Sequence, residues 1–320
     1  MKTISPPLLS LLVALNVLVP SAQACSVCGC SLSSDWGLQG FSETPGALLS
    51  LRYESFDQTD LRSGAHSLDR SALAFPQDGE IQLSTTNRNV WLGLDYVIDA
   101  KWAVSAQLPW HDRDHRTIAE GDTAVSTSHA RGSGDARVIA RYQLKSDLAG
   151  RWSLQFGLKL PTGRTDQDFT SGPHEGEPLD RGLQLGTGTT DVLAGLAWFG
   201  RPLTNLGGFA QALFDQPLAA RDGFTPSPSL TLSGGVRWLN ASAFTPQLQV
   251  NVRCEGREHG VNSDPDNSGG TVAYLSPGLT AELHPRVSAF AFVQIPVYQH
   301  WHGLQLQPHA LFITGMNCRW

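Results

Sequence analysis

The chain contains few charged residues and no long apolar run. Charged residues make up 16% of its 320 positions, lysine is scarce compared with arginine, and the formal net charge is −6 at pH 7. A nucleic-acid-binding protein usually presents a basic face, so this balance argues against nucleic acid as a partner. The apolar run from Leu8 to Val19 is too short for a membrane-spanning helix, which needs about 20 residues.

Motifs that mark common catalytic sites are also absent from the sequence. It contains no Gly-x-Ser-x-Gly, no His-Glu-x-x-His and no nucleotide-binding loop. Helical periodicity is hard to find anywhere in the chain. We therefore expect a protein that is not an enzyme and is not built from helices.

The first residues have the pattern of a secretory signal peptide. Lys2 supplies a positive charge, Leu8 to Val19 is apolar, and Ala22-Gln23-Ala24 places small residues where signal peptidase requires them. We place cleavage after Ala24, so residues 1–24 are the predicted signal peptide. Cys25 would then follow the cut, which leaves a lipoprotein as an alternative, although Ala22 stands where a lipobox usually has leucine.

Polar and apolar residues alternate through most of the remaining chain. From Phe244 to Glu255 every second residue is apolar and every intervening one is polar, and in a strand these two sets face opposite sides of the sheet. Segments of this kind occur at 46–56, 82–98, 101–112, 133–145, 151–161, 184–199, 205–215, 228–239, 243–255, 270–283, 286–298 and 303–320.

The connections between these segments alternate in length. Short turns are expected at 99–100, 146–150, 200–204, 240–242 and 284–285, and longer polar stretches at 57–81, 113–132, 162–183, 216–227 and 256–269, with 299–302 as the one short member of the second set. Long loops outside and tight turns in the periplasm are typical of outer-membrane barrels. The sequence therefore predicts an all-β fold, a transmembrane antiparallel up-and-down β-barrel of about twelve strands over residues 46–320, with both termini in the periplasm of a Gram-negative cell.

The end of the chain supports the same prediction. Its last strand reads Phe312, Thr314, Met316, Cys318 and Trp320 at alternate positions, a mostly apolar face that ends in an aromatic residue. Such a terminal strand is the type that the barrel-assembly machinery recognises, so we expect this machinery and outer-membrane lipid as partners. Tryptophans near strand ends suit the interfacial girdles of a barrel, and they are Trp91, Trp102, Trp110, Trp152, Trp198, Trp238 and Trp301.

If the apolar residues face lipid, the polar residues line the interior. The charged members of this predicted lumen lining are Arg52, Glu54, Asp95, Asp135, Arg137, Arg141, Lys159, Asp191, Arg237, Arg253 and Glu255. They either pair across the lumen and hold its shape, or form a constriction that selects solutes by charge. A twelve-strand barrel is wider than the eight-strand size that side chains just fill, so a cavity is expected.

Several glycine-rich motifs resemble a known family of outer-membrane proteins, the transporters of the phenol meta-degradation pathway. The matching stretches are Gly132-Ser133-Gly134-Asp135, Leu160-Pro161-Thr162-Gly163, Gly186-Thr187-Gly188-Thr189-Thr190-Asp191, Tyr298-Gln299 and Gly303-Leu304-Gln305-Leu306. This resemblance covers about 135 to 320 and implies a barrel through which small, often hydrophobic compounds pass. We thus expect a channel for small solutes, hydrophobic or aromatic ones among them.

A cysteine motif follows the predicted cleavage site, in a predicted periplasmic segment at 25–45. Cys25, Cys28 and Cys30 could bind copper or zinc, could form a disulfide or redox site in the oxidising periplasm, or could carry lipid at Cys25. The alternative function is therefore a barrel anchor that presents a metal-binding or redox segment. Cys254 and Cys318 fall on the lipid-facing set and are expected to be apolar fillers.

Histidines and aspartates gather in one predicted external loop. His111, Asp112, Asp114 and His115, with His129 further along, are expected to be solvated, and a surface metal site is the alternative. The enzyme class that competes with a channel is a barrel phospholipase. It would need serine and histidine together on the lipid-facing wall, where this sequence places no histidine.

Overall fold

The computed structural model describes residues 45–77, 79–148, 150–239 and 243–320. The predicted signal peptide and the Cys25, Cys28 and Cys30 motif lie outside the described residues. The strands are β1 (Gly46–Gly64), β2 (His66–Leu68), β3 (Ile81–Val97), β4 (Trp102–Ile118), β5 (Ser126–Ser133), β6 (Ala136–Asp147), β7 (Gly150–Leu160), β8 (Asp191–Leu203), β9 (Leu206–Pro217), β10 (Ser229–Trp238), β11 (Phe244–Glu255), β12 (Gly270–His284), β13 (Val287–Pro308) and β14 (Leu311–Arg319). Two 3-10 turns, η1 (Arg70–Ala72) and η2 (Arg181–Leu183), lie in loops.

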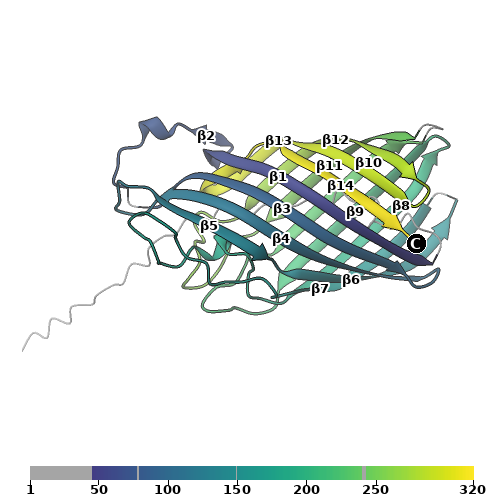
Figure 1. Ribbon diagram of the computed structural model, residues 1–320, viewed down its shortest axis with the longest axis horizontal. Helices are drawn as coiled ribbons and strands as arrows, with labels where there is room; N and C mark the ends of the chain where they lie inside the picture. The colour runs from purple at the N-terminus through teal and green to yellow at the C-terminus, as the bar shows by residue number, and fades with distance from the viewer. Residues whose placement is uncertain (1–44, 78, 149, 240–242) are drawn as a thin grey trace, which may run out of the picture.

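These strands form one sheet that closes on itself (Figure 1). Each wall strand pairs antiparallel with its neighbour in the chain, and β1 pairs with β3 on one side and with β14 on the other. Of the strands in the described residues, β2 only extends the end of β1, while β5 and β6 share one place beside β4. The wall is therefore a closed barrel of 12 antiparallel strands, as predicted. Closure leaves no unpaired edge, the condition for a sheet to cross a bilayer.

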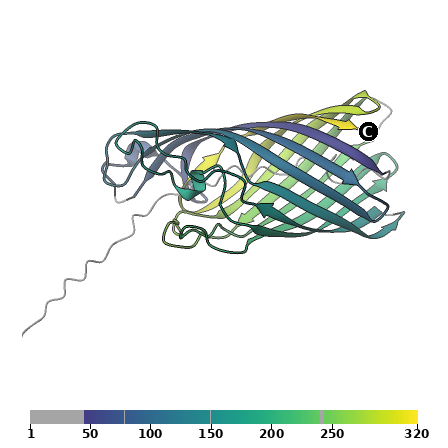
Figure 2. The same cartoon turned by 60° about the horizontal axis from the view of Figure 1, so that its bottom comes forward.

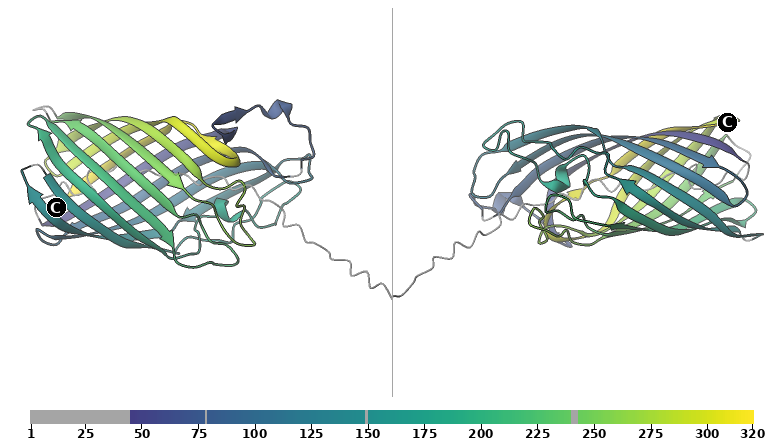
Figure 3. Two further views of the ribbon diagram at one scale, coloured as in Figure 1. Left: turned by 180° about the vertical axis from the view of Figure 1, so that it is seen from behind. Right: turned by 90° about the horizontal axis from the view of Figure 1, so that it is seen from below.

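Long and short connections separate to opposite ends of the barrel (Figures 1 and 2). The long loops gather at the end remote from the C-terminus, and the strands there project beyond the closed wall. Tight turns join β3 to β4, β6 to β7, β8 to β9 and β12 to β13 at the other end. The views from behind and from below show the same steep tilt of all wall strands (Figure 3). Tilted strands and sorted connections are the geometry of a transmembrane barrel.

Predicted strand ends were wrong where strands continue into the loops: β1 runs to Gly64 and β4 to Ile118, beyond the predicted ends at 56 and 112. The last outer connection lies close to the predicted 299–302. Within β13, Val287 to Trp301 pair with β12, whereas Leu304 to Pro308 pair antiparallel with β1 in the register that β14 continues, so the chain reverses direction between Trp301 and Leu304. Gly303 has a φ of 61°, which suits this turn. The strand predicted from residue 184 begins only at Asp191, since η2 and the residues after it remain in the loop.

The two faces of the wall differ as the alternation predicts. In β3, Leu92, Leu94 and Tyr96 are exposed by 47%, 43% and 51% on the outside, while the residues between them face inward. Apolar side chains of this kind surround the barrel, and a continuous apolar surface of this size requires an apolar environment. Within the described chain, no helix is long and apolar enough to cross a membrane.

The predicted aromatic girdle is only partly on the outside. Trp102, Trp110 and Trp152 are well exposed on the outer surface, as is Trp238. Trp91 and Trp301 are buried, because they lie on the inward set of their strands. Tryptophan near a strand end therefore does not by itself identify the lipid face.

Candidate functional site: the barrel lumen

The predicted charged lining is largely buried. Seven of its members are buried, namely Arg52, Glu54, Asp95, Asp135, Arg141, Lys159 and Asp191. The other four are partly buried, namely Arg137, Arg237, Arg253 and Glu255. Buried charges are costly unless they are paired and hydrogen-bonded, so the contacts of each group determine its role.

One ion pair forms on the inner face of β1, beside Trp91 of β3. The Arg52 guanidinium lies 3.0 Å from Glu54, and the Trp91 indole N–H donates to the Glu54 carboxylate at 2.9 Å. The guanidinium also lies over the Trp91 ring, 5.0 Å from its centroid. This cation–π contact and the hydrogen bond explain why Trp91 is turned inward.

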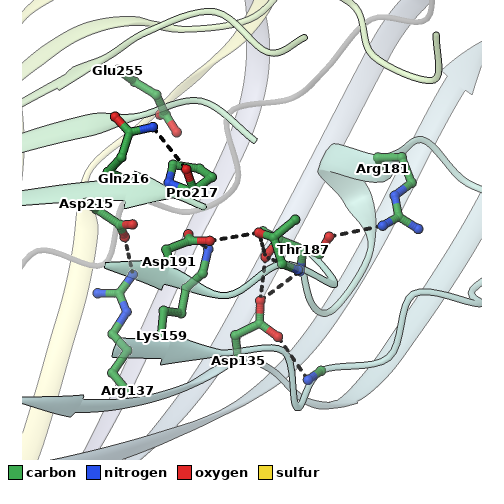
Figure 4. Close-up of polar contacts among 12 residues, drawn as sticks. Asp135, Arg137, Lys159, Arg181, Thr187, Asp191, Asp215, Gln216, Pro217 and Glu255 are labelled. Carbon is green, nitrogen blue, oxygen red and sulfur yellow. Dashed lines mark hydrogen bonds and ion pairs between the residues drawn. The ribbon is translucent and has the colours of Figure 1, made fainter. Parts of the chain in front are cut away.

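Further pairs join the inner faces of different strands. Lys159 of β7 pairs with Asp191 of the neighbouring β8 (Figure 4), and Arg141 of β6 reaches across β4 to Asp95 of β3. Within β11, Arg253 lies 3.2 Å from Glu255. The paired charges thus stabilise the wall, and they leave a lumen surface of both signs rather than a single-sign filter.

Asp135 joins the glycine-rich motifs. Its carboxylate accepts hydrogen bonds from the backbone N–H of Gly163 at 3.0 Å and of Thr187 at 2.8 Å, and from the Thr187 hydroxyl at 2.9 Å (Figure 4). A Cβ on Gly186 would lie 2.5 Å from an Asp135 oxygen, so only glycine allows this approach. Three motifs that are far apart in the sequence therefore meet around one carboxylate, which ties the β7–β8 loop to the wall.

The tied β7–β8 loop folds into the mouth of the barrel. Leu179, Leu183 and Leu185 are buried, and Arg113 of β4 donates to the Leu183 carbonyl at 2.8 Å. Arg181 lies over the ring of Phe224 at 5.4 Å. Side chains from the wall and from two loops, β7–β8 and β9–β10, thus pack together in the mouth.

A cavity of about 180 Å³ remains beside this loop. Its walls combine aromatic and charged groups, and they include Trp91, Pro109, His111, Arg113, Asp135, Arg137, Lys159, Arg181, Leu185, Asp191, Asp215, Phe224, Arg253 and Glu255. Arg137 and Asp215 are only 3.9 Å apart across it, a loose pair that leaves both groups accessible to a solute. The cavity can hold a small molecule with an apolar body and a polar end.

An apolar cluster continues the lumen beyond the charged region, which the expectation of a polar interior did not include. Its members are Ala197, Phe199, Phe209, Phe290, Phe292 and Ile313. They come from β8 and β9 and from β13 and β14, which are separated in the sheet by β10, β11 and β12. Their packing therefore bridges part of the interior.

Glycines beneath these rings are the signal that could have revealed the cluster. Phe209 lies opposite Gly235 of β10, Phe292 opposite Gly278 of β12, and Phe290 opposite Gly315 of β14. A Cβ on any of these glycines would collide with the ring of its partner. A glycine inside a strand often marks such a close approach.

The predicted histidine and aspartate loop is split between two faces. Asp112, Asp114 and His129 bring ligand atoms within 4.8 Å of one another on the outer side, whereas His111 and His115 face inward. His129 hydrogen-bonds Asp114 at 2.7 Å, and Arg88 lies 3.0 Å from the same carboxylate. Arg88 already neutralises the Asp114 carboxylate, so these residues form an ion-pair cluster. Cys254 and Cys318 are free and half-buried.

Comparisons with known proteins define the fold. No family model and no curated protein matches the chain. Among solved structures, it is similar to an outer-membrane channel from Pseudomonas putida F1, with a TM-score of 0.64 and 11% identity over 89% of this chain and 99% of that one. It also matches the NanC porin (TM-score 0.46, 10% identity, 85% of this chain and 100% of that chain) and the CymD monoaromatic hydrocarbon channel (0.40, 9%, 93% and 97%).

The match to the Pseudomonas putida channel establishes a shared fold at almost full length of both chains. The two lower scores add nothing to this. The resemblance to the phenol-pathway transporters stays a prediction, since no family match supports it.

Proposed function

We propose that this chain is an outer-membrane channel that passes small solutes, hydrophobic or aromatic ones among them. The observation that carries the proposal is the layered interior, in which a cavity of mixed aromatic and charged lining precedes an apolar aromatic cluster. The channel-like fold and the apolar outer surface agree with it. The outer membrane is then its location, with lipid around the wall and both chain ends on the periplasmic side.

The order of the two layers favours a particular class of solute. A hydrophobic constriction loses its water and therefore blocks hydrated ions. An aromatic ring enters it favourably, because the apolar surface of the ring leaves water. The charged cavity at the mouth can bind the polar substituent of a solute while its aromatic ring enters the apolar cluster. Small aromatic compounds with one polar end satisfy both layers, and hydrated ions do not.

Purified full-length protein in liposomes tests this function. We expect the wild type to pass a small aromatic carboxylate faster than chloride. Phe292→Ala removes a ring from the apolar cluster, so it should increase chloride flux. Phe312→Ala is the matched control, because this ring is 62% exposed on the outer surface of the neighbouring strand.

Two results would count against the proposal. A wild-type barrel that passes chloride as fast as the aromatic probe would be an open aqueous pore. Equal effects of the two phenylalanine substitutions would show that the apolar cluster does not control passage.

A further inference from the structure

Four carboxylates converge at the loop end of the barrel, and one of them, Glu258, also lines the cavity described above. Glu80 immediately precedes β3, Asp180 precedes η2, and Glu258 and Asp264 belong to the β11–β12 loop. Asp180, Glu258 and Asp264 are at most 9% exposed, and the Glu80 side chain is 8% exposed. Glu80 is within hydrogen-bonding contact of Asp180, and the charges of the other two act on it.

The Asp180 carboxyl has no ordinary structural role. It occupies the N-cap position of η2 but makes no capping hydrogen bond, and its Oδ2 atom is buried without a hydrogen-bond partner. Burial, and then the Glu80 carboxylate, raise the pKa of Asp180 well above its ordinary value. A buried carboxyl surrounded by carboxylates is strongly unfavourable unless a proton or a cation neutralises it.

Two arginines that adjoin these carboxylates in the sequence make contacts of their own. Arg181 donates to the Thr187 carbonyl and lies over Phe224. Arg257 donates to the Pro265 carbonyl and lies 3.6 Å from Asp266.

A histidine provides a separate indication of a ligand. His115 is 1% exposed, its Nδ1 atom is hydrogen-bonded to the Thr85 hydroxyl at 2.8 Å, and its Nε2 atom has no hydrogen-bond partner. Nε2 points toward Glu80 at 3.8 Å, which is too long for a hydrogen bond. Two ligands of one Ca²⁺, each at about 2.3–2.6 Å from it, are separated by roughly this distance or somewhat more.

We propose that Glu80, Asp180, Glu258 and Asp264, with His115 at the edge, bind one hard divalent cation such as Ca²⁺ or Mn²⁺. Carboxylate oxygens are the preferred ligands of these ions, and Mn²⁺ also accepts imidazole. The ion would link the segment before β3 to the β7–β8 and β11–β12 loops, so it would fix the loop that closes the mouth. This inference does not depend on which solute passes through the barrel.

The proposed site is looser than the outer Asp112 cluster. Among the described residues, Asp112, Asp114 and His129 are the group whose ligand atoms already lie within 4.8 Å of one another. That outer group is partly exposed and paired with Arg88, whereas the inner group is buried. Binding at the inner site should therefore draw the three loops together.

Calorimetric titration of full-length protein in detergent, stripped with EDTA, tests the site. We expect one Ca²⁺ or Mn²⁺ per chain, and Asp180→Asn should weaken binding by about tenfold or more because it removes one ligand charge. Glu258→Gln is a second variant with the same expected direction. Asp166→Asn is the matched control, since Asp166 lies exposed in the same loop and pairs with Arg164.

Thermal melting separates a cation site from a folding defect. Without divalent cations, Asp180→Asn should melt no lower than the wild type, since it removes a buried carboxyl. With Ca²⁺, the wild type should gain melting temperature and the variant should not. The proposal is overturned if the wild type binds neither cation at millimolar concentration, or if Asp112→Asn and not Asp180→Asn abolishes binding.

Discussion

At the scale of single residues, neighbours along a strand meet opposite environments. Val250 of β11 is 49% exposed on the outer surface, while Gln249 beside it is 1% exposed and faces the lumen. Val250 pairs with Leu275 and Gly234 in the middle of its strand, far from either end. Its side chain therefore lies within the apolar band.

Arginine at this position should destabilise the barrel strongly. We expect Val250→Arg to cost about 2–4 kcal/mol in urea unfolding from lipid vesicles, because a charge near the bilayer centre loses its hydration. Val261→Arg is the matched control, since Val261 is 81% exposed in a loop, and it should change the unfolding free energy little. Equal costs at both positions would show that Val250 does not contact lipid.

The buried pair of Arg52 and Glu54 leads to a second residue-scale prediction. Glu54 is fully buried, so Glu54→Ala leaves the Arg52 guanidinium without its counterion and should cost about 3–5 kcal/mol of unfolding free energy. Asp147→Ala breaks an exposed pair with Lys145 and should cost less than about 1 kcal/mol. A cost below 1 kcal/mol for Glu54→Ala in the same unfolding assay would mean that water reaches this pair.

Sequence patterns predicted which charged residues lie inside but not how they pair. Alternation assigns Asp95 and Arg141 to inward faces, yet they pair across the intervening strand β4 only because of the register set by the whole sheet. The inward phenylalanines were missed for a related reason. The sequence alone does not assign an apolar residue of a half-buried strand to the inner or the outer face. The glycine on the neighbouring strand shows the inward position, as Gly278 opposite Phe292 does, but it is identified only once the register is known.

At the scale of elements, hydrogen bonds between loops hold the long loops in place. His174 of the β7–β8 loop bonds Glu177 at 2.6 Å within its own loop and Asp122 of the preceding outer loop at 3.0 Å. The hydrogen bond to Glu177, and then the charges of Glu177 and Asp122, raise the pKa of His174 above its ordinary value of 6.5. The folded state therefore holds this proton more tightly than the unfolded chain does. The stabilisation from the tie between the loops is fully present below the pKa that His174 has in the unfolded chain.

That contribution disappears as the pH rises through the raised pKa of His174. We therefore expect hydrogen exchange at 165–178 to accelerate between pH 6 and pH 9 more than the intrinsic rate does. His174→Gln should remove this pH dependence, and His66→Gln, in β2 on a different loop, should keep it. Identical profiles for wild type and His174→Gln would mean that His174 does not hold the loop.

The sequence predicted the number and order of wall strands, and it misplaced the ends of those that continue into loops. The alternation of polar and apolar residues ends at the edge of the lipid bilayer, whereas backbone pairing between strands continues beyond it. β1 and β4 continue past their last alternating residues into the outer loops, so local pattern could not show that they end only at Gly64 and Ile118. The inward fold of the β7–β8 loop depends on Asp135, which is remote in sequence from Thr187.

At the scale of the whole molecule, an even number of strands fixes the sidedness of the chain. Gly46 and Trp320 lie beside each other at the short-turn end, where the backbones of Ala47 and Trp320 are hydrogen-bonded at 3.0 Å. If the proposed export holds, this end is periplasmic and the long loops face outward. Labelling of introduced cysteines in cells tests this directly.

Leu148 and Val261 provide matched positions at the two ends. Leu148 lies fully exposed in the turn between β6 and β7, and Val261 is exposed in a long loop. In a variant without the native cysteines, a bulky maleimide on intact cells should label Val261→Cys and not Leu148→Cys, because the bilayer and the packed lumen block the reagent. Permeabilised cells should show labelling at both positions, which controls for thiol reactivity. Labelling of Leu148→Cys but not Val261→Cys in sealed cells would mean that the barrel has the opposite orientation.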